Sequence, residues 1–168
     1  MSLILGNRLP DRAMSYLKVG RLVVLATVNE DGRPDTCPVS WVVALNPSVI
    51  RLAISREVNT YRNTLNNEHV MLSLVGGAMT LGIRGRARVL TDSLDGIPLS
   101  MAIVEMEVDE VKDDSVIGRG LEDELIKWEE RRRSVSDWHV ENALRTTGPL
   151  PQSDAVMMDQ MSQNYDPA

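Results

Sequence analysis

The stretch that decides the fold is TLGIRGRARVL, which runs from Thr80 to Leu90. Small and apolar residues alternate there with the arginines Arg84, Arg86 and Arg88. Successive side chains of a β-strand point to opposite faces of the sheet, so this period of two predicts a strand with one buried and one solvated face.

A complementary pattern follows at about Ala102 to Val111. The apolar residues Val104, Met106 and Val108 alternate there with the acids Glu105, Glu107 and Asp109. An arginine-bearing strand beside an acid-bearing strand brings opposite charges across from each other, which stabilises the pair. We therefore expect these two strands to be adjacent and antiparallel, with their charged residues facing outward.

Further strands and two short helices are predicted from apolar runs and turn signals earlier in the chain. The strands are expected over Leu22 to Val28, Thr36 to Ala44, Val49 to Ser55 and Val70 to Val75, and the helices over Pro10 to Lys18 and Asn59 to Asn66. Short turns between the early strands indicate an antiparallel meander. Six strands of this kind favour a closed or sandwich-like β-structure, and a small barrel would remove exposed sheet edges.

The pattern changes to helical spacing from Leu121 onward. The residues that follow this spacing are Leu121, Leu125, Trp128 and Val135. The stretch from Ser134 to Asp137 is expected to interrupt this helix and to cap a second helix through Leu144. We divide the chain into a domain of residues 1–147 and a tail of residues 148–168, which is expected to be flexible or to act as a dimer arm.

The composition argues against several classes of protein. The chain has 168 residues, of which 43% are hydrophobic and 25% charged, as in an ordinary globular domain. Its net charge of −6 and the lack of a basic stripe argue against nucleic acid as a partner. The single cysteine, Cys37, excludes an intrachain disulfide, and the two histidines lack the spacing of metal ligands. No apolar run is long enough for a membrane span, and we expect a cytoplasmic protein without a metal.

Four short motifs follow one another in an order that is informative as a set. They are Asp31-Gly32-Arg33-Pro34, Pro38-Val39, Thr60-Tyr61-Arg62-Asn63-Thr64 and Gly85-Arg86-Ala87. In their order and spacing the chain resembles the pyridoxamine 5′-phosphate oxidase-like family, the FMN-binding split barrels, over about residues 10 to 112. The resemblance implies a mainly β fold with flanking helices: a six-stranded antiparallel split β-barrel followed by a helical C-terminal segment. It also implies a homodimer with the cofactor at the dimer interface.

The resemblance also points to the residues that contact the cofactor. The second strand would run beside the flavin ring, through Pro38, Val39, Ser40 and Trp41, and Thr80 stands where the family often has a polar ring contact. A phosphate needs hydroxyl, guanidinium and N–H groups, which Ser55, Arg56, Thr60 and Asn63 could supply. The family commonly has a phosphate-binding lysine at the position of Thr60, so Arg56 or Arg62 could substitute, or the cofactor could differ.

Two functional hypotheses follow from these expectations. The first is an FMN-dependent oxidoreductase that acts on a small molecule, in which the protein supplies binding, orientation and electrostatics. The second is a non-catalytic cofactor-binding or electron-transfer module that takes deazaflavin, haem or no cofactor. No side chain stands out as a general acid or base, so no catalytic residue is assigned. Trp138 and His139 could cover a cofactor from a partner subunit or could serve packing alone.

Overall fold

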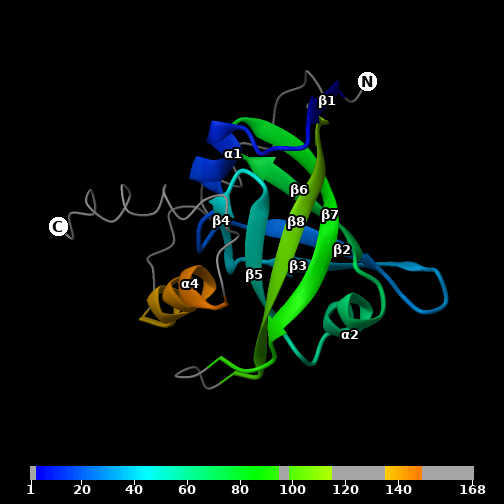
Figure 1. Ribbon diagram of the computed structural model, residues 1–168, viewed down its shortest axis with the longest axis vertical. Coiled ribbons are helices and arrows are strands. Elements are labelled where there is room, and N and C mark those ends of the chain that lie inside the picture. Colours follow the sequence, from blue (N-terminus) through cyan, green and yellow to red (C-terminus); the bar gives the residue numbers. More distant parts are fainter. Residues whose placement is uncertain (1–2, 95–98, 115–134, 149–168) are drawn as a thin grey trace.

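The computed structural model describes residues 3–94, 99–114 and 135–148 of the chain. They form one antiparallel sheet of eight strands with three helices around it (Figure 1). The strands are β1 (Leu3–Gly6), β2 (Val23–Val28), β3 (Pro34–Val39), β4 (Val42–Asn46), β5 (Val49–Ser55), β6 (His69–Gly76), β7 (Met79–Thr91) and β8 (Met101–Asp113). The helices are α1 (Asp11–Tyr16), α2 (Asn59–Asn66) and α4 (Val135–Thr146).

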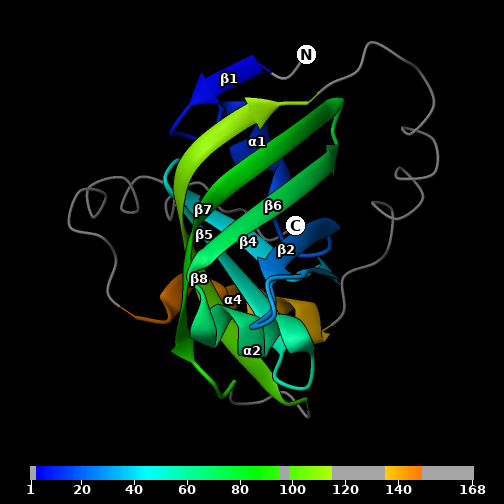
Figure 2. The ribbon, with the colours of Figure 1, turned by 90° about the vertical axis from the view of Figure 1, so that its right-hand side faces the viewer.

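The strands pair in the order β3-β2-β6-β7-β8-β5-β4, and β1 pairs with the end of β8 beyond β5. The long strand β8 pairs with β7 along one edge and with β5 and then β1 along the other. Figure 2 shows that β1 and α1 lie at one end of the curved sheet, whereas α2 and α4 lie at the other end. In Figure 1 these two helices stand on opposite sides of that end.

The prediction of a six-stranded barrel is wrong, because the sheet has eight strands and is not closed. Among the described residues no ladder joins its outermost strands, β3 and β4. The single strand predicted over Thr36 to Ala44 is in fact two strands, which pair with β2 and with β5 at the two ends of the sheet. The chain crosses between them at Ser40 and Trp41, whose carbonyl groups accept hydrogen bonds from the backbone N–H groups of Gly20 (2.8 Å) and Ala53 (2.9 Å).

The predicted pairing of the arginine-bearing and acid-bearing strands is confirmed. β7 and β8 are antiparallel neighbours, and their ion pairs are Arg84–Glu110 (3.0 Å), Arg86–Glu107 (3.2 Å), Arg86–Asp109 (3.4 Å) and Arg88–Glu105 (2.7 Å). The register shifts between Arg84 and Gly85, and a Cβ atom at Gly85 would collide with the backbone carbonyl oxygen of Glu107. This close approach explains why the motif Gly85-Arg86-Ala87 begins with glycine.

The expectation that Glu105 faces outward is wrong. Its side chain is 3% exposed because α4 covers this part of the sheet. α4 is held there by apolar contacts, in which Val140 and Leu144 pack with Val43 and Ile103. Two polar contacts add to them: Trp41 Nε1 donates to Asp137 Oδ1 at 2.9 Å, and Arg51 Nη1 donates to the carbonyl of Leu144 at 3.0 Å.

A larger core lies between the strands of the curved sheet and α1. Its fully buried side chains include Leu25, Leu52, Leu72, Ile83 and Met106. The second helix predicted near the C-terminus is confirmed as α4, although it extends to Thr146. The helix predicted from Leu121 and the tail after Gly148 lie outside the described residues. Within the described part of the chain, no helix has the length and apolar content needed to cross a membrane.

Candidate functional site

The helix α2 packs against the sheet through polar side chains. Thr60 and Asn63 face β2 and β3 and are only 1% and 5% exposed. The Thr60 hydroxyl donates to Asp35 Oδ2 at 3.3 Å. Asn63 Nδ2 lies within hydrogen-bond distance of three oxygens, on Thr27 (2.9 Å), Asn29 (2.7 Å) and Asp35 (3.4 Å). We call these five residues the α2 cluster.

The side-chain donors that α2 contributes to the cluster, Thr60 Oγ1 and Asn63 Nδ2, both bond to protein oxygens. An asparagine amide carries two hydrogens, and here three oxygens compete for them. The thiol of Cys37 adjoins the cluster: burial raises its pKa, and the negative charge of Asp35 raises it further, while a hydrogen bond with Thr60 acts in the opposite direction. The cluster therefore combines a carboxylate and a thiol with two helix donors that already bind protein oxygens.

A groove of about 460 Å³ opens beside the α2 cluster. The residues that line it are Asn29, Glu30, Asp31, Asn59, Arg62, Asn63 and Asn66. Glu30 accepts a hydrogen bond from Asn66 at 2.8 Å, and Asp31 pairs with Arg33 at 3.3 Å. Arg62 is the single cation among the described lining residues, and it stands with two carboxylates, so the groove does not have the basic character of a phosphate site.

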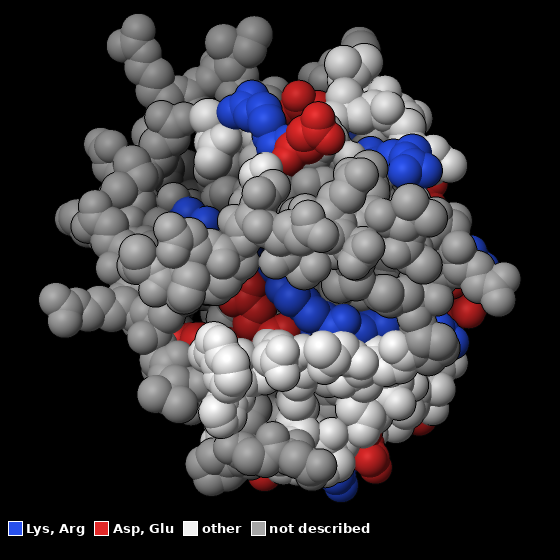
Figure 3. Space-filling model, turned by 60° about the vertical axis from the view of Figure 1, so that its left-hand side comes forward, with Lys and Arg blue, Asp and Glu red and all other residues white. Residues whose placement is uncertain are grey.

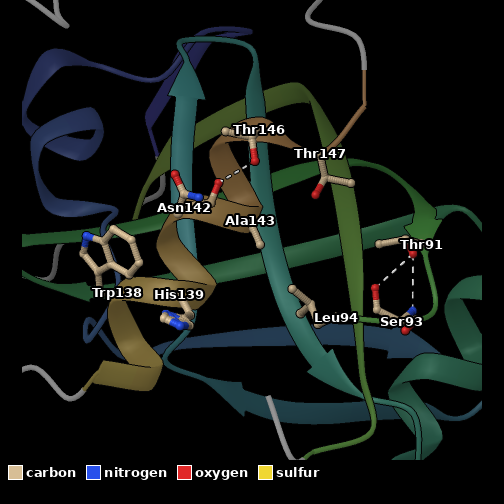
Figure 4. Close-up of a pocket in the computed structure, with 9 residues that line it drawn as sticks. All are labelled: Thr91, Ser93, Leu94, Trp138, His139, Asn142, Ala143, Thr146 and Thr147. Carbon is tan, nitrogen blue, oxygen red and sulfur yellow. Dashed lines mark hydrogen bonds between the residues drawn. The ribbon is translucent and has the colours of Figure 1, made fainter. Parts of the chain in front are cut away.

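A second hollow, which we call the α4 cavity, also measures about 460 Å³. It is lined by Thr91, Ser93, Leu94, Trp138, His139, Asn142, Ala143, Thr146 and Thr147 (Figure 4). None of these side chains except the imidazole is titratable. Trp138 is 62% exposed and meets the edge of the His139 ring with a centroid distance of 5.0 Å. Figure 3 turns this side of the molecule toward the viewer, and its described surface carries acidic and basic side chains close together rather than a patch of one sign.

Two of the predicted cofactor contacts bond to residues next to the lining of the α4 cavity, although neither lines it. Arg56 Nη1 donates to the carbonyl of Asp92 at 3.1 Å, and Asp92 stands between the lining residues Thr91 and Ser93. Trp41 donates to Asp137, the residue before Trp138. Arg56 is exposed, so the rest of its guanidinium remains accessible beside the cavity.

The other predicted contacts are spread over the fold. Pro38 and Val39 pair with β2, and Val39 is buried in the core. Ser40 lies at the crossing from β3 to β4, and the Ser55 hydroxyl oxygen accepts a hydrogen bond from the N–H of Glu57 at 3.2 Å. Thr80 pairs with Val75 near the start of β7, at the opposite end of the sheet from α2 and α4. The structure thus groups Thr60 with Asn63 and bonds Trp41 and Arg56 to residues adjacent to the α4 cavity, but it leaves Thr80 apart.

Reasoning from the sequence did not identify Asp35, Thr27 and Asn29 as partners of Thr60 and Asn63. Asp35 and Thr27 lie opposite each other on β3 and β2. The register of the β2–β3 hairpin could have identified them, because it places two polar side chains opposite each other. Polar side chains that become buried need hydrogen-bond partners, and the polar residues of α2 supply them.

Comparison with known proteins places the chain in a family. The sequence profile described as pyridoxamine 5′-phosphate oxidase matches residues 9–115. A solved structure assigned as a candidate pyridoxamine 5′-phosphate oxidase from Lactobacillus delbrueckii is 22% identical, with a TM-score of 0.55 over 64% of this chain and 97% of that chain. A variant of HupZ from Group A Streptococcus is 16% identical, with a TM-score of 0.53 over 62% of this chain and 98% of that one.

These structures share the fold, and at such identities they show the fold alone. No curated protein sequence matches the chain. The profile match covers more than half of the sequence and includes all four motifs on which the resemblance rests. The chain belongs to the pyridoxamine 5′-phosphate oxidase family.

Proposed function

We propose that the chain is an FMN-binding oxidoreductase that acts on a small molecule as a homodimer. The observation that carries this proposal is the family match over residues 9–115. The α4 cavity supports it, because a volume of about 460 Å³ falls within the range of small-ligand sites. When bound, the flavin would supply the redox chemistry, and the protein would bind and orient it.

The residues at the end of β5 fit a flavin phosphate. Arg56 is exposed and uses one guanidinium nitrogen on the carbonyl of Asp92, so its remaining N–H groups can reach a ligand. The Ser55 hydroxyl oxygen accepts a hydrogen bond and keeps its own proton to donate. We propose that these two residues hold the phosphate and that the ring lies along Pro38 to Trp41.

The residues of α2 do not fit the same phosphate. The Thr60 hydroxyl and the Asn63 amide already bind protein oxygens, one of which belongs to the Asp35 carboxylate. We therefore assign no phosphate contact to them. The proposed homodimer is supported by the adjacent exposed apolar side chains of β1, Leu3 (63% exposed) and Ile4 (65%), because contiguous exposed apolar residues are typical of protein interfaces.

The purified protein and an FMN titration test the proposal together. Flavin absorption in the visible spectrum, or fluorescence quenching on addition of FMN, would support it, and a colourless protein that ignores added FMN would refute it. Arg56→Ala should weaken FMN binding by about 1.5–3 kcal/mol, the scale of a charged hydrogen bond, which is roughly a 10- to 150-fold higher Kd.

The matched control is Arg62→Ala, which also removes an exposed arginine, in this case one on α2. It should leave the FMN affinity within about threefold, and equal losses in both variants would mean that the phosphate is misplaced. Sedimentation tests the assembly, for which a monomer at micromolar concentration would contradict the dimer.

The contact between Thr60 and Asp35 favours a second candidate function. A carboxylate at the position expected to bind phosphate suits a non-catalytic cofactor-binding or electron-transfer module that does not take FMN. Such a module would take deazaflavin, haem or no cofactor, and Asp35 does not choose among these, because haem propionates are also anionic. A Soret band in the same spectrum would support haem. Tight binding of a deazaflavin without binding of FMN would support the module that uses that cofactor.

A further inference from the structure

The α4 cavity is lined by none of the residues that are proposed to hold the flavin. α4 and the residue that follows it supply one wall, and the end of β7 with the residues after it supplies the other (Figure 4). α4 is anchored near both ends, because Asp137 accepts a hydrogen bond from Trp41 at 2.9 Å and the carbonyl of Leu144 accepts one from Arg51 at 3.0 Å. The walls are therefore held in place by the protein itself, as in most small-molecule sites.

One ring nitrogen of His139 is a buried polar atom without a partner. His139 lines the cavity, and its Nδ1 is shielded from solvent and has no hydrogen bond within the described part of the chain. Nearly all buried polar side-chain atoms of folded proteins have a hydrogen-bond partner, and leaving one without a partner is unfavourable. Nδ1 is therefore an unused hydrogen-bonding group in the wall of the cavity, which a ligand can satisfy.

The other polar groups of the cavity offer hydrogen bonds without charge. The hydroxyl groups of Thr91 and Thr146 already donate to backbone carbonyls, at 3.1 and 2.9 Å. The amide of Asn142 and the hydroxyl of Thr147 have no hydrogen bond among the described residues, so they can bind a ligand. None of the described lining residues carries a carboxylate, an ammonium or a guanidinium group. An ionic ligand would lose hydration without gaining an opposite charge from these walls, which favours an uncharged ligand.

The indole of Trp138 favours a flat ligand. Trp138 also lines the cavity, and it is 62% exposed although its side chain is large and aromatic. Aromatic rings attract one another beyond what the burial of their area supplies. A ligand that binds Nδ1 of His139 lies within reach of the indole, because the centroids of the two rings are 5.0 Å apart. The hydrogen-bonding group and the aromatic surface can therefore act on one molecule.

We infer that the α4 cavity binds a small, uncharged, planar molecule whose amide or hydroxyl group forms a hydrogen bond with Nδ1 of His139 and whose ring packs against Trp138. Amide and hydroxyl groups suit either tautomer of the imidazole, because each of them both donates and accepts hydrogen bonds. The site itself does not depend on a flavin. That its ligand is the substrate of the oxidoreductase rests on the proposed function.

Benzamide is a suitable probe, because it is uncharged and planar and carries a primary amide. The chain has two histidines, so proton NMR gives one imidazole C2 signal from each, and His69→Phe leaves only the signal of His139. We expect benzamide to shift the His139 signal to saturation and to leave that of His69, which is exposed at the start of β6, in place. Benzoate and benzylammonium, which carry a negative and a positive charge, should bind at least about tenfold more weakly.

Two variants test the named contacts, with the NMR signals of the probe as the measure of binding. His139→Phe keeps a planar ring but removes Nδ1 and should raise the benzamide Kd by about 3- to 10-fold, whereas the control His69→Phe should leave it within about twofold. The wild-type protein should prefer benzamide to the non-planar cyclohexanecarboxamide by about 3- to 10-fold, and Trp138→Leu should reduce this preference below about twofold.

Several results would overturn the inference: an unmoved His139 signal, equal binding of the charged probes, or equal Kd values in His139→Phe and His69→Phe. Displacement of benzamide by FMN would also overturn it, because the flavin would then occupy the cavity. If benzamide binds as expected while the protein does not bind FMN, the α4 site stands and the flavin assignment falls. If FMN binds while benzamide leaves the His139 signal unmoved, the flavin assignment survives and the α4 site is disproved.

Discussion

Replacing Glu105 by glutamine should destabilise the protein far more than an ordinary surface substitution would. Glu105 and Arg51 are 3% and 0% exposed and lie beneath α4. Arg51 Nε donates to Glu105 Oε2 at 2.8 Å, and Arg51 Nη2 lies 2.8 Å from the same oxygen without hydrogen-bond geometry. Arg51 Nη1 donates to the carbonyl of Leu144, so the ion pair also anchors the end of α4.

The magnitude follows from what the substitution leaves behind. Glutamine has nearly the volume of glutamate, so Glu105→Gln opens no cavity but removes the charge that balances the buried guanidinium of Arg51. Breaking a buried pair in this way costs about 3–5 kcal/mol. The other carboxylate oxygen of Glu105 provides a matched control. Its Oε1 accepts a hydrogen bond from Arg88, whose side chain is 64% exposed. Arg88→Ala breaks a solvent-screened pair and should cost only about 0–1 kcal/mol.

Urea unfolding followed by circular dichroism measures the free energy of unfolding of both variants, and thermal unfolding measures their Tm. For a chain of this size each kcal/mol corresponds to about 2–4 °C in Tm, so Glu105→Gln should lower Tm by roughly 6–20 °C and Arg88→Ala by less than about 4 °C. The double variant Arg51→Met/Glu105→Met removes both charges and should be more stable than Glu105→Gln alone. A cost of Glu105→Gln below about 1 kcal/mol, equal to that of Arg88→Ala, would refute the reasoning.

Two further predictions concern single positions. Gly85→Ala should destabilise the protein by about 1–3 kcal/mol in urea unfolding, because its Cβ would collide with the rigid backbone of Glu107. Gly82→Ala is the control, since its Cβ would meet only the flexible ends of side chains, and an equal cost in both variants would contradict this explanation. Because burial and then Asp35 raise the pKa of Cys37, its alkylation by iodoacetamide should reach half of the maximal rate at a higher pH than in an unfolded control. Asp35→Asn should lower that pH, and an unchanged profile in the variant would show that the carboxylate does not act on the thiol.

The elements predicted well are those whose ends carry strong local signals. β5 and α2 have the predicted bounds, and β6, β7 and β8 differ from the predictions by one or two residues at each end. The alternation along β7 and β8 needs no knowledge of distant residues, because charge complementarity between successive strands already suggests their pairing. Local sequence patterns are therefore sufficient to predict the pairing of two strands that follow each other in the chain.

The two errors in strand number have the opposite cause. No glycine, asparagine or aspartate marks the crossing at Ser40 and Trp41, and the turn signals near it are only Pro38 and Ser40, so the sequence there reads as one continuous strand. β1 is a short strand whose residues are all exposed, and it therefore lacks the alternation by which strands are recognised. Glu105 was misplaced for a related reason, because the helix that covers it begins thirty residues later in the chain.

The candidate site shows a subtler limit of sequence reasoning. A hydroxyl and an amide at the start of a helix are suited to binding an oxyanion, and the sequence supports that expectation for Thr60 and Asn63. Carboxylates and phosphates are both oxyanions and take the same donors, so the motif does not reveal which of them is bound. That choice depends on Asp35, which lies 25 residues before Thr60 and faces it only because β3 folds back on β2. The local motif thus predicts the chemistry of recognition, whereas the long-range register determines whether the anion comes from the protein or from a ligand.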